Sequence, residues 1–109
     1  MKARLKSEIW VKATVKRLNH ELITTMVIKS GDPDAGDIYI KVNFLNGYSR
    51  IFSRTFGEKG EHVWLATTGD SNVIESSANN YLKKQVQFDP DCWIIEIEDP
   101  RSNFCITDI

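Results

Sequence analysis

The stretch that decides the fold is Ile38-Tyr39-Ile40-Lys41-Val42-Asn43-Phe44, which continues through Leu45-Asn46-Gly47 into Tyr48-Ser49-Arg50-Ile51-Phe52-Ser53-Arg54-Thr55. Apolar and polar residues alternate along its first half, which is typical of a strand with one buried face. An Asn-Gly dipeptide between two such runs favours a two-residue turn in which both residues take positive φ. The stretch is therefore predicted to form an antiparallel hairpin.

The expected turn also predicts which hairpin residues face each other. If Leu45 faces Tyr48, the apolar residues of the two strands share the buried side. The opposite side then carries three cations and two aromatic rings: Tyr39, Lys41, Arg50, Phe52 and Arg54. Cations that contact phosphates, beside rings that stack on bases, are features of nucleic-acid-binding surfaces. The alternative interpretation is that the rings pack under a helix while the charged ends reach solvent.

The composition is that of an ordinary globular protein. A length of 109 residues predicts one domain, residues 1–109, and 41% hydrophobic and 27% charged residues are typical of such domains. A net charge of −1 gives no overall field that would attract nucleic acid or a membrane surface. We recognise neither a membrane span nor an export signal, so we expect a cytoplasmic protein whose two cysteines, Cys92 and Cys105, are reduced and buried.

The remaining elements flank the hairpin in an order that indicates the fold class. The order α-β-β-β-β-α-β predicts an α+β fold, in which two helices cover a mainly antiparallel sheet of about five strands. The expected elements besides the hairpin are a helix over residues 5–19, strands over 23–28, 62–67 and 92–98, a helix that begins after an N-cap at Ser71 or Asn72 and ends at Asp89-Pro90, and a short edge strand over 104–106.

Two acidic loops are the candidate metal site. The tripeptide Asp-Pro-Asp occurs twice and supplies Asp32, Asp34, Asp89 and Asp91. Hard oxygen ligands from two loops suit Mg²⁺, and carboxylate-bound Mg²⁺ can promote phosphodiester hydrolysis. The nuclease signature that this arrangement suggests is incomplete, because Tyr39 stands where an acid is needed. The alternative interpretation is that both tripeptides only form turns.

Three blocks of the sequence resemble one family: residues 4–11, residues 31–43 and the segment Phe88-Asp89-Pro90-Asp91-Cys92-Trp93-Ile94-Ile95-Glu96-Ile97-Glu98-Asp99. The chain is similar to a family of short bacterial proteins known only as a domain of unknown function. The resemblance extends over nearly the whole chain, and the third block is its most distinctive part. It implies a stand-alone domain with a first helix, and it brings no activity or site residue.

The sequence favours a non-enzymatic protein without a cofactor. It contains no motif that links a nucleophile to a histidine and no phosphate-binding glycine loop. Positive charge gathers in residues 1–20 and negative charge in residues 89–108, a pattern that suits a protein partner or a homodimer. The alternative interpretation is that both are solvated faces whose signs differ by chance. Two alternatives stay open: a nucleic-acid-binding protein that uses Lys41, Arg50 and Arg54, and a magnesium-dependent phosphodiesterase that uses the two acidic loops.

Overall fold

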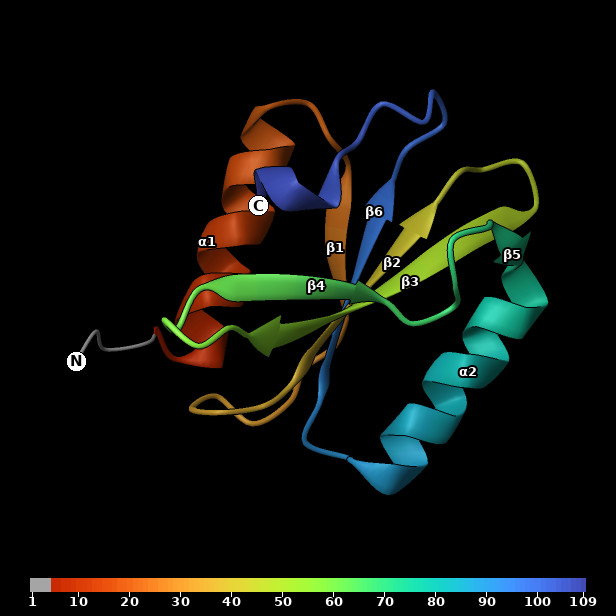
Figure 1. Cartoon of the computed structure of the whole chain (residues 1–109). Coiled ribbons are helices and arrows are strands. Elements are labelled where there is room, and N and C mark those ends of the chain that lie inside the picture. Colours follow the sequence, from red (N-terminus) through yellow and green to blue (C-terminus); the bar gives the residue numbers. More distant parts are fainter. Residues whose placement is uncertain (1–4) are drawn as a thin grey trace.

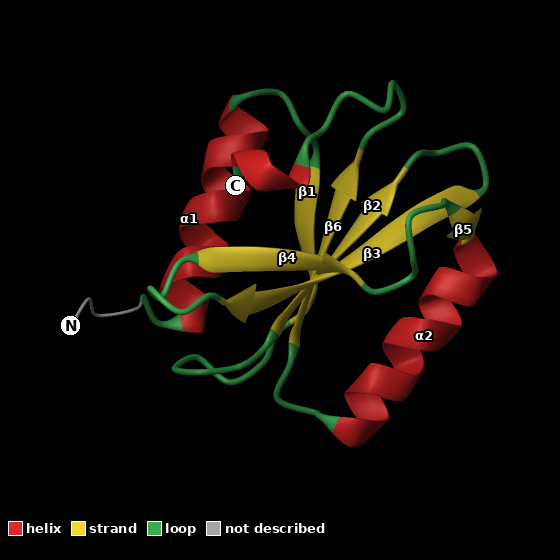
Figure 2. Ribbon diagram, in the orientation of Figure 1, coloured by secondary structure: helices red, strands yellow, loops and turns green. Residues whose placement is uncertain are grey.

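The computed structural model describes residues 5–109 and shows two helices on a six-stranded sheet (Figures 1 and 2). The predicted α+β fold class and element order are confirmed. The elements in chain order are α1 (Ser7–His20), β1 (Thr25–Lys29), β2 (Ile38–Asn43), β3 (Tyr48–Phe56), β4 (His62–Ala66), β5 (Val73–Ile74), α2 (Glu75–Phe88), β6 (Trp93–Glu98) and a 3-10 helix, η1 (Ile106–Asp108).

The sheet has the strand order β1-β6-β2-β3-β4, and the short β5 pairs with β3. Its pairs are antiparallel except β2 with β6, which is parallel because β6 returns through α2 and inserts between β1 and β2. Strand β6 is buried on both sides, which explains its nearly continuous apolar run. The edges of the sheet are therefore β1 and β4.

The register of the central hairpin differs by one residue from the prediction. Ile40 faces Phe52 and Lys41 faces Ile51, because the strands are joined by three residues, 45–47, and not by two. Leu45 and Gly47 both have positive φ, of 58° and 91°, and the N–H of Leu45 is held by the side chain of Asn43. A three-residue loop that contains a left-handed glycine is a common alternative to the two-residue turn.

The two helices cover opposite faces of the sheet (Figure 1). The face under α1 holds the larger core, in which Trp10, Val11 and Leu18 pack against apolar residues of β2 and β6. The C-terminal segment adds to this layer through Phe104 and other partly buried residues. On the other face, Ala78 and Leu82 of α2 pack in a smaller cluster: Ile51, Cys92 and Ile94.

Helix α2 begins later than the predicted N-cap at Ser71 or Asn72. Residues 73–74 pair instead with Tyr48 and Ser49 of β3, so their backbone groups belong to the sheet. The first helical residue is Glu75. The predicted end of the helix is confirmed, since Phe88 is its last residue before Asp89-Pro90.

The C-terminal segment does not form the predicted edge strand over residues 104–106. The carboxylate of Asp99 accepts hydrogen bonds from the N–H groups of Asn103 and Phe104, at 2.9 and 3.0 Å, and turns the chain away from the sheet. A 3-10 helix follows. The expectation that both cysteines are buried is also only half right, because Cys92 is buried and Cys105 is exposed, each as a free thiol.

Candidate functional site

The two acidic loops meet, but they do so through their backbones. The N–H of Asp32 donates to the carbonyl of Asp91 at 2.8 Å, and the indole of Trp93 donates to the carbonyl of Asp32 at 2.7 Å. This contact is close enough to require glycine, because a Cβ on Gly31 would overlap the backbone of Asp91 and Cys92. The packing explains why both loops are rich in turn residues.

The four aspartates of these loops do not gather around a common point. The carboxylate of Asp32 accepts from the N–H of Ala35, and that of Asp89 accepts from the N–H of Asp91, as in ordinary Asx turns. Asp34 lies 3.5 Å from the ammonium of Lys6 at the surface. Within residues 5–109, no group of three His, Cys, Asp or Glu side chains has the geometry of a metal site.

The five residues of the predicted cationic hairpin face lie on two different faces. With the observed register, Tyr39 and Lys41 lie under α2, whereas Arg50, Phe52 and Arg54 lie on the side of α1. The prediction that they share one surface was wrong, because a shift of one residue exchanges the two sides of a strand.

The arginines of β3 are stacked on aromatic rings. The guanidinium of Arg54 lies 5.2 Å from the ring centre of Trp10 and 4.9 Å from that of Phe56. Arg50 lies over Phe52 at 4.9 Å and donates to a loop carbonyl. These distances are those of cation–π contacts, so both side chains take part in packing within the domain.

Tyr39 is also engaged inside the domain. Its hydroxyl donates to the amide oxygen of Gln85 on α2 at 3.3 Å, and its ring meets Tyr81 edge to face. Burial, followed by the charges of Tyr81 and Asp37, raises the pKa of Tyr39 to about 12. The phenol is therefore neutral at physiological pH.

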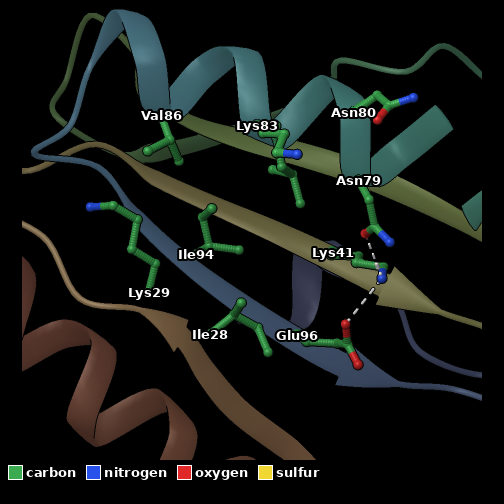
Figure 3. A pocket seen from close by; sticks show the side chains of 10 residues that line it. Ile28, Lys29, Lys41, Asn79, Asn80, Lys83, Val86, Ile94 and Glu96 are labelled. Atoms are coloured by element: carbon green, nitrogen blue, oxygen red, sulfur yellow. Dashed lines mark hydrogen bonds and ion pairs between the residues drawn. The ribbon is translucent and has the colours of Figure 1, made fainter. Parts of the chain in front are cut away.

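Lys41 is the centre of a buried polar network. Its side chain is only 5% exposed, although it lies in an alternating strand at a position that the sequence predicts to face solvent. The ammonium donates to Glu75 at 3.0 Å. It also donates to Asn79 at 2.9 Å and lies 3.2 Å from the carboxylate of Glu96 (Figure 3). Glu75 and Asn79 are one turn apart on α2, and Glu96 is the neighbour of Lys41 in the parallel pair.

A groove runs beside this network, between α2 and strands β6 and β1 (Figure 3). We call it the α2 groove. Its volume is about 390 Å³. Four apolar side chains form its floor, and Lys41, Asn79 and Glu96 form its polar end. Its lining residues are Ile28, Lys29, Lys41, Asn79, Asn80, Leu82, Lys83, Val86, Ile94 and Glu96.

Most residues of the groove were missed by sequence reasoning. Glu75, Asn79 and Lys83 recur every four residues and Glu96 lies in a strand, and in both patterns polar residues are typical of a solvated side. Because Glu75 and Asn79 are four residues apart on α2, their side chains lie on one face of the helix and can contact the same lysine. Which lysine they meet depends on the parallel pairing of β2 and β6, and local sequence does not reveal that pairing.

Comparison with known protein families identifies the family of this chain. The family model described as "Protein of unknown function (DUF1491)" matches residues 5–106. The chain belongs to this family. The resemblance that the sequence carried is thereby confirmed. No protein with a curated description matches the sequence.

Solved structures of DUF1491 proteins share the whole fold. A crystal structure of a DUF1491 family protein from Caulobacter crescentus CB15 has 31% identity and a TM-score of 0.76, over 89% of this chain and 90% of that one. An NMR structure of a DUF1491 protein from the same organism also has 31% identity, with a TM-score of 0.75 over 92% and 90%. Protein Atu0922 from A. tumefaciens, at 24% identity and a TM-score of 0.73 over 88% and 86%, supports the fold alone.

The DUF1491 assignment places the site on a domain without an assigned activity. Neither helix among residues 5–109 is long and apolar enough to cross a bilayer. The α2 groove combines an apolar floor with converging polar groups, which is the usual composition of a binding site.

Proposed function

We propose that this DUF1491 protein is a non-enzymatic interaction domain that binds a segment of a protein partner in the α2 groove. The observation that carries the proposal is the apolar floor of the groove, which continues onto Ile28 of the edge strand β1. The side chain of this residue is 54% exposed, although it adjoins buried Ile94 and Leu82. An apolar groove on a helix and sheet surface is a common docking site for a peptide segment.

The polar end of the groove indicates the chemistry of the segment. Lys41 contributes one positive charge there, whereas Glu75 and Glu96 contribute two negative charges. Lys29 and Lys83 also line the groove, so three lysines stand against the two glutamates and the net charge is +1. A complementary segment places apolar side chains along the floor and an aspartate or glutamate beside Lys83.

The test is photo-crosslinking with benzoylphenylalanine at position 28, in cells of the source organism. The matched control carries the same residue in place of Phe88, which is 85% exposed at the end of α2 and does not line the groove. We expect a defined cross-linked protein from position 28 alone. That protein, once purified, should bind the wild-type domain in calorimetry.

The binding measurement then decides the proposal. The variant Ile28→Asp should weaken the affinity about tenfold or more, because it places a carboxylate on the apolar floor of the groove. Replacement of the acidic residue in the partner segment by alanine should also weaken binding. Unchanged affinity in Ile28→Asp, or the same cross-linked species from positions 28 and 88, would overturn the proposal.

A further inference from the structure

The two edge strands of the sheet differ in how they are protected. Strand β1 is interrupted by a register shift between Val27 and Lys29, and it ends on that lysine. Bulges and lysines are devices that keep sheet edges from pairing with other chains. Strand β4 has neither, because its pairing with β3 is regular and it contains no lysine. Within residues 5–109, no strand lies on its outer side.

The backbone of β4 has hydrogen-bonding groups directed toward this open edge. Thr67 donates to the carbonyl of Ile51 at 3.0 Å, and Gly57 donates to that of Glu61 at 2.9 Å. Because residues of an antiparallel ladder alternate between bonding inward and outward, Val63 and Leu65 bond inward to β3. The backbone groups of Trp64 and Ala66 then point outward from the sheet.

The side chains of β4 divide between the two faces of the sheet. Trp64 packs against Trp10 at 5.7 Å between ring centres, on the α1 side. Val63 and Leu65 lie on the α2 side, and they are 37% and 51% exposed. Two apolar residues on an unpaired edge strand form a surface suited to a second strand.

We propose that this strand pairs antiparallel with β4 of a second copy of the chain, about a two-fold axis at Trp64. Trp64 then lies opposite its own copy, in the hydrogen-bonded position that its outward backbone groups require. Val63 faces Leu65 of the second copy, and Leu65 faces Val63. Each exposed apolar residue is thus covered by another, and the interface is closed by its symmetry.

The charges near the axis are compatible with this arrangement. The nearest charged residue in sequence is Glu61, and it faces Thr67 of the second copy in this register. No like charges therefore stand opposite each other along the paired strands. The α2 groove lies on the other side of the helix, so this interface and the proposed function can fail independently.

Two double variants at the same positions test the register. In V63K/L65K, lysines face lysines across the axis twice. In V63K/L65E, each introduced lysine faces an introduced glutamate. Like charges directly opposite destabilise an antiparallel pair, and opposite charges stabilise it. We expect V63K/L65K to raise the dissociation constant about tenfold or more, and V63K/L65E to stay within about threefold of the wild type.

The measurement is sedimentation equilibrium over a range of protein concentrations, with far-UV circular dichroism to show that each variant is folded. Leu22→Lys is the surface control, because Leu22 is 92% exposed outside β4 and its replacement should leave dimerisation unchanged. A wild-type protein that stays monomeric up to about 1 mM would overturn the proposal. Equal dissociation of the two double variants would overturn it as well.

Discussion

Replacement of Lys41 by methionine tests whether the network under α2 stabilises the fold. Methionine keeps the length and apolar stem of the side chain but removes the ammonium that contacts Glu75, Asn79 and Glu96. The carboxylate of Glu96, whose side chain is only 15% exposed, then loses its cation. The dominant effect is therefore an uncompensated charge, and the apolar packing changes little.

The magnitude follows from the exposure of the partners. Removal of one partner from a fully buried ion pair costs about 3–5 kcal/mol. Glu75 is 41% exposed and Glu96 borders the groove, so water compensates part of the loss. We expect a decrease of about 2–3 kcal/mol in the free energy of unfolding, which for a chain of this length lowers Tm by about 10 °C. In Lys41→Met/Glu96→Gln the decrease should fall to about 1 kcal/mol.

Urea unfolding followed by tryptophan fluorescence measures these differences. The matched control is Lys12→Met, since Lys12 also pairs with a carboxylate, that of Glu8, but the two side chains are 72% and 43% exposed. Such a surface pair contributes less than about 0.5 kcal/mol. If Lys41→Met and Lys12→Met destabilise the protein equally, or if the second substitution at Glu96 recovers nothing, the network does not stabilise the fold as argued.

Three further predictions concern other parts of the molecule. Gly31→Ala should lower Tm far more than Gly47→Ala, because a Cβ on Gly31 would overlap the backbone of the facing loop. At Gly47, which has a φ of 91°, no atom lies within 4 Å of an added Cβ. Thermal unfolding measures both variants, and equal decreases in Tm would contradict the close approach of the loops. In a thiol-labelling assay, Cys105 should react at once and Cys92 only as the protein unfolds. The reason is that Cys92 is buried and that its burial raises the pKa of the thiol. Rapid labelling of both cysteines in the folded protein would refute this prediction. Burial raises the pKa of Tyr39 from 10.0 to about 12, so the unfolded chain ionises first and stability should fall between pH 10 and pH 12. That fall should be smaller in Tyr39→Phe, measured by urea unfolding across this range, and an unchanged slope would contradict the assignment.

The fold class and the element order could be predicted because they depend on local pattern. Alternation, turn residues and the Asp89-Pro90 stop are readable within a few residues of each element. The register of the hairpin was not readable, because Asn46-Gly47 is compatible with loops of two and three residues. The choice between them depends on Leu45 taking a φ of 58°, which leucine rarely does. One loop residue therefore decided which face every side chain of the hairpin occupies.

The candidate site could not be predicted for a different reason. Alternation separates the two sides of a strand, and in a half-exposed sheet the polar side faces water. Strand β2 is central and covered on both faces, so the polar side of its pattern, with Lys41, lies under α2. The insertion of β6 beside β2 creates this environment, and it pairs residues 55 positions apart, such as Lys41 and Glu96. Where both faces of a strand are covered, a lysine in an alternating pattern marks a buried network.

The exposed apolar residues of both proposed interfaces lie on the same face of the sheet, and the dimensions of the fold explain why. Four spacings of about 4.8 Å separate β1 from β4, which makes the sheet about 19 Å wide, whereas one helix with its side chains covers about 10–12 Å. The α1 face is completed by the C-terminal segment, with Phe104, Ile106 and Ile109 packed on its core. Among residues 5–109, the α2 face is covered by one helix (Figure 1). Apolar residues at its two margins, Ile28 on one side and Val63 with Leu65 on the other, are therefore left exposed, and this is the face that a partner chain or a second copy would complete.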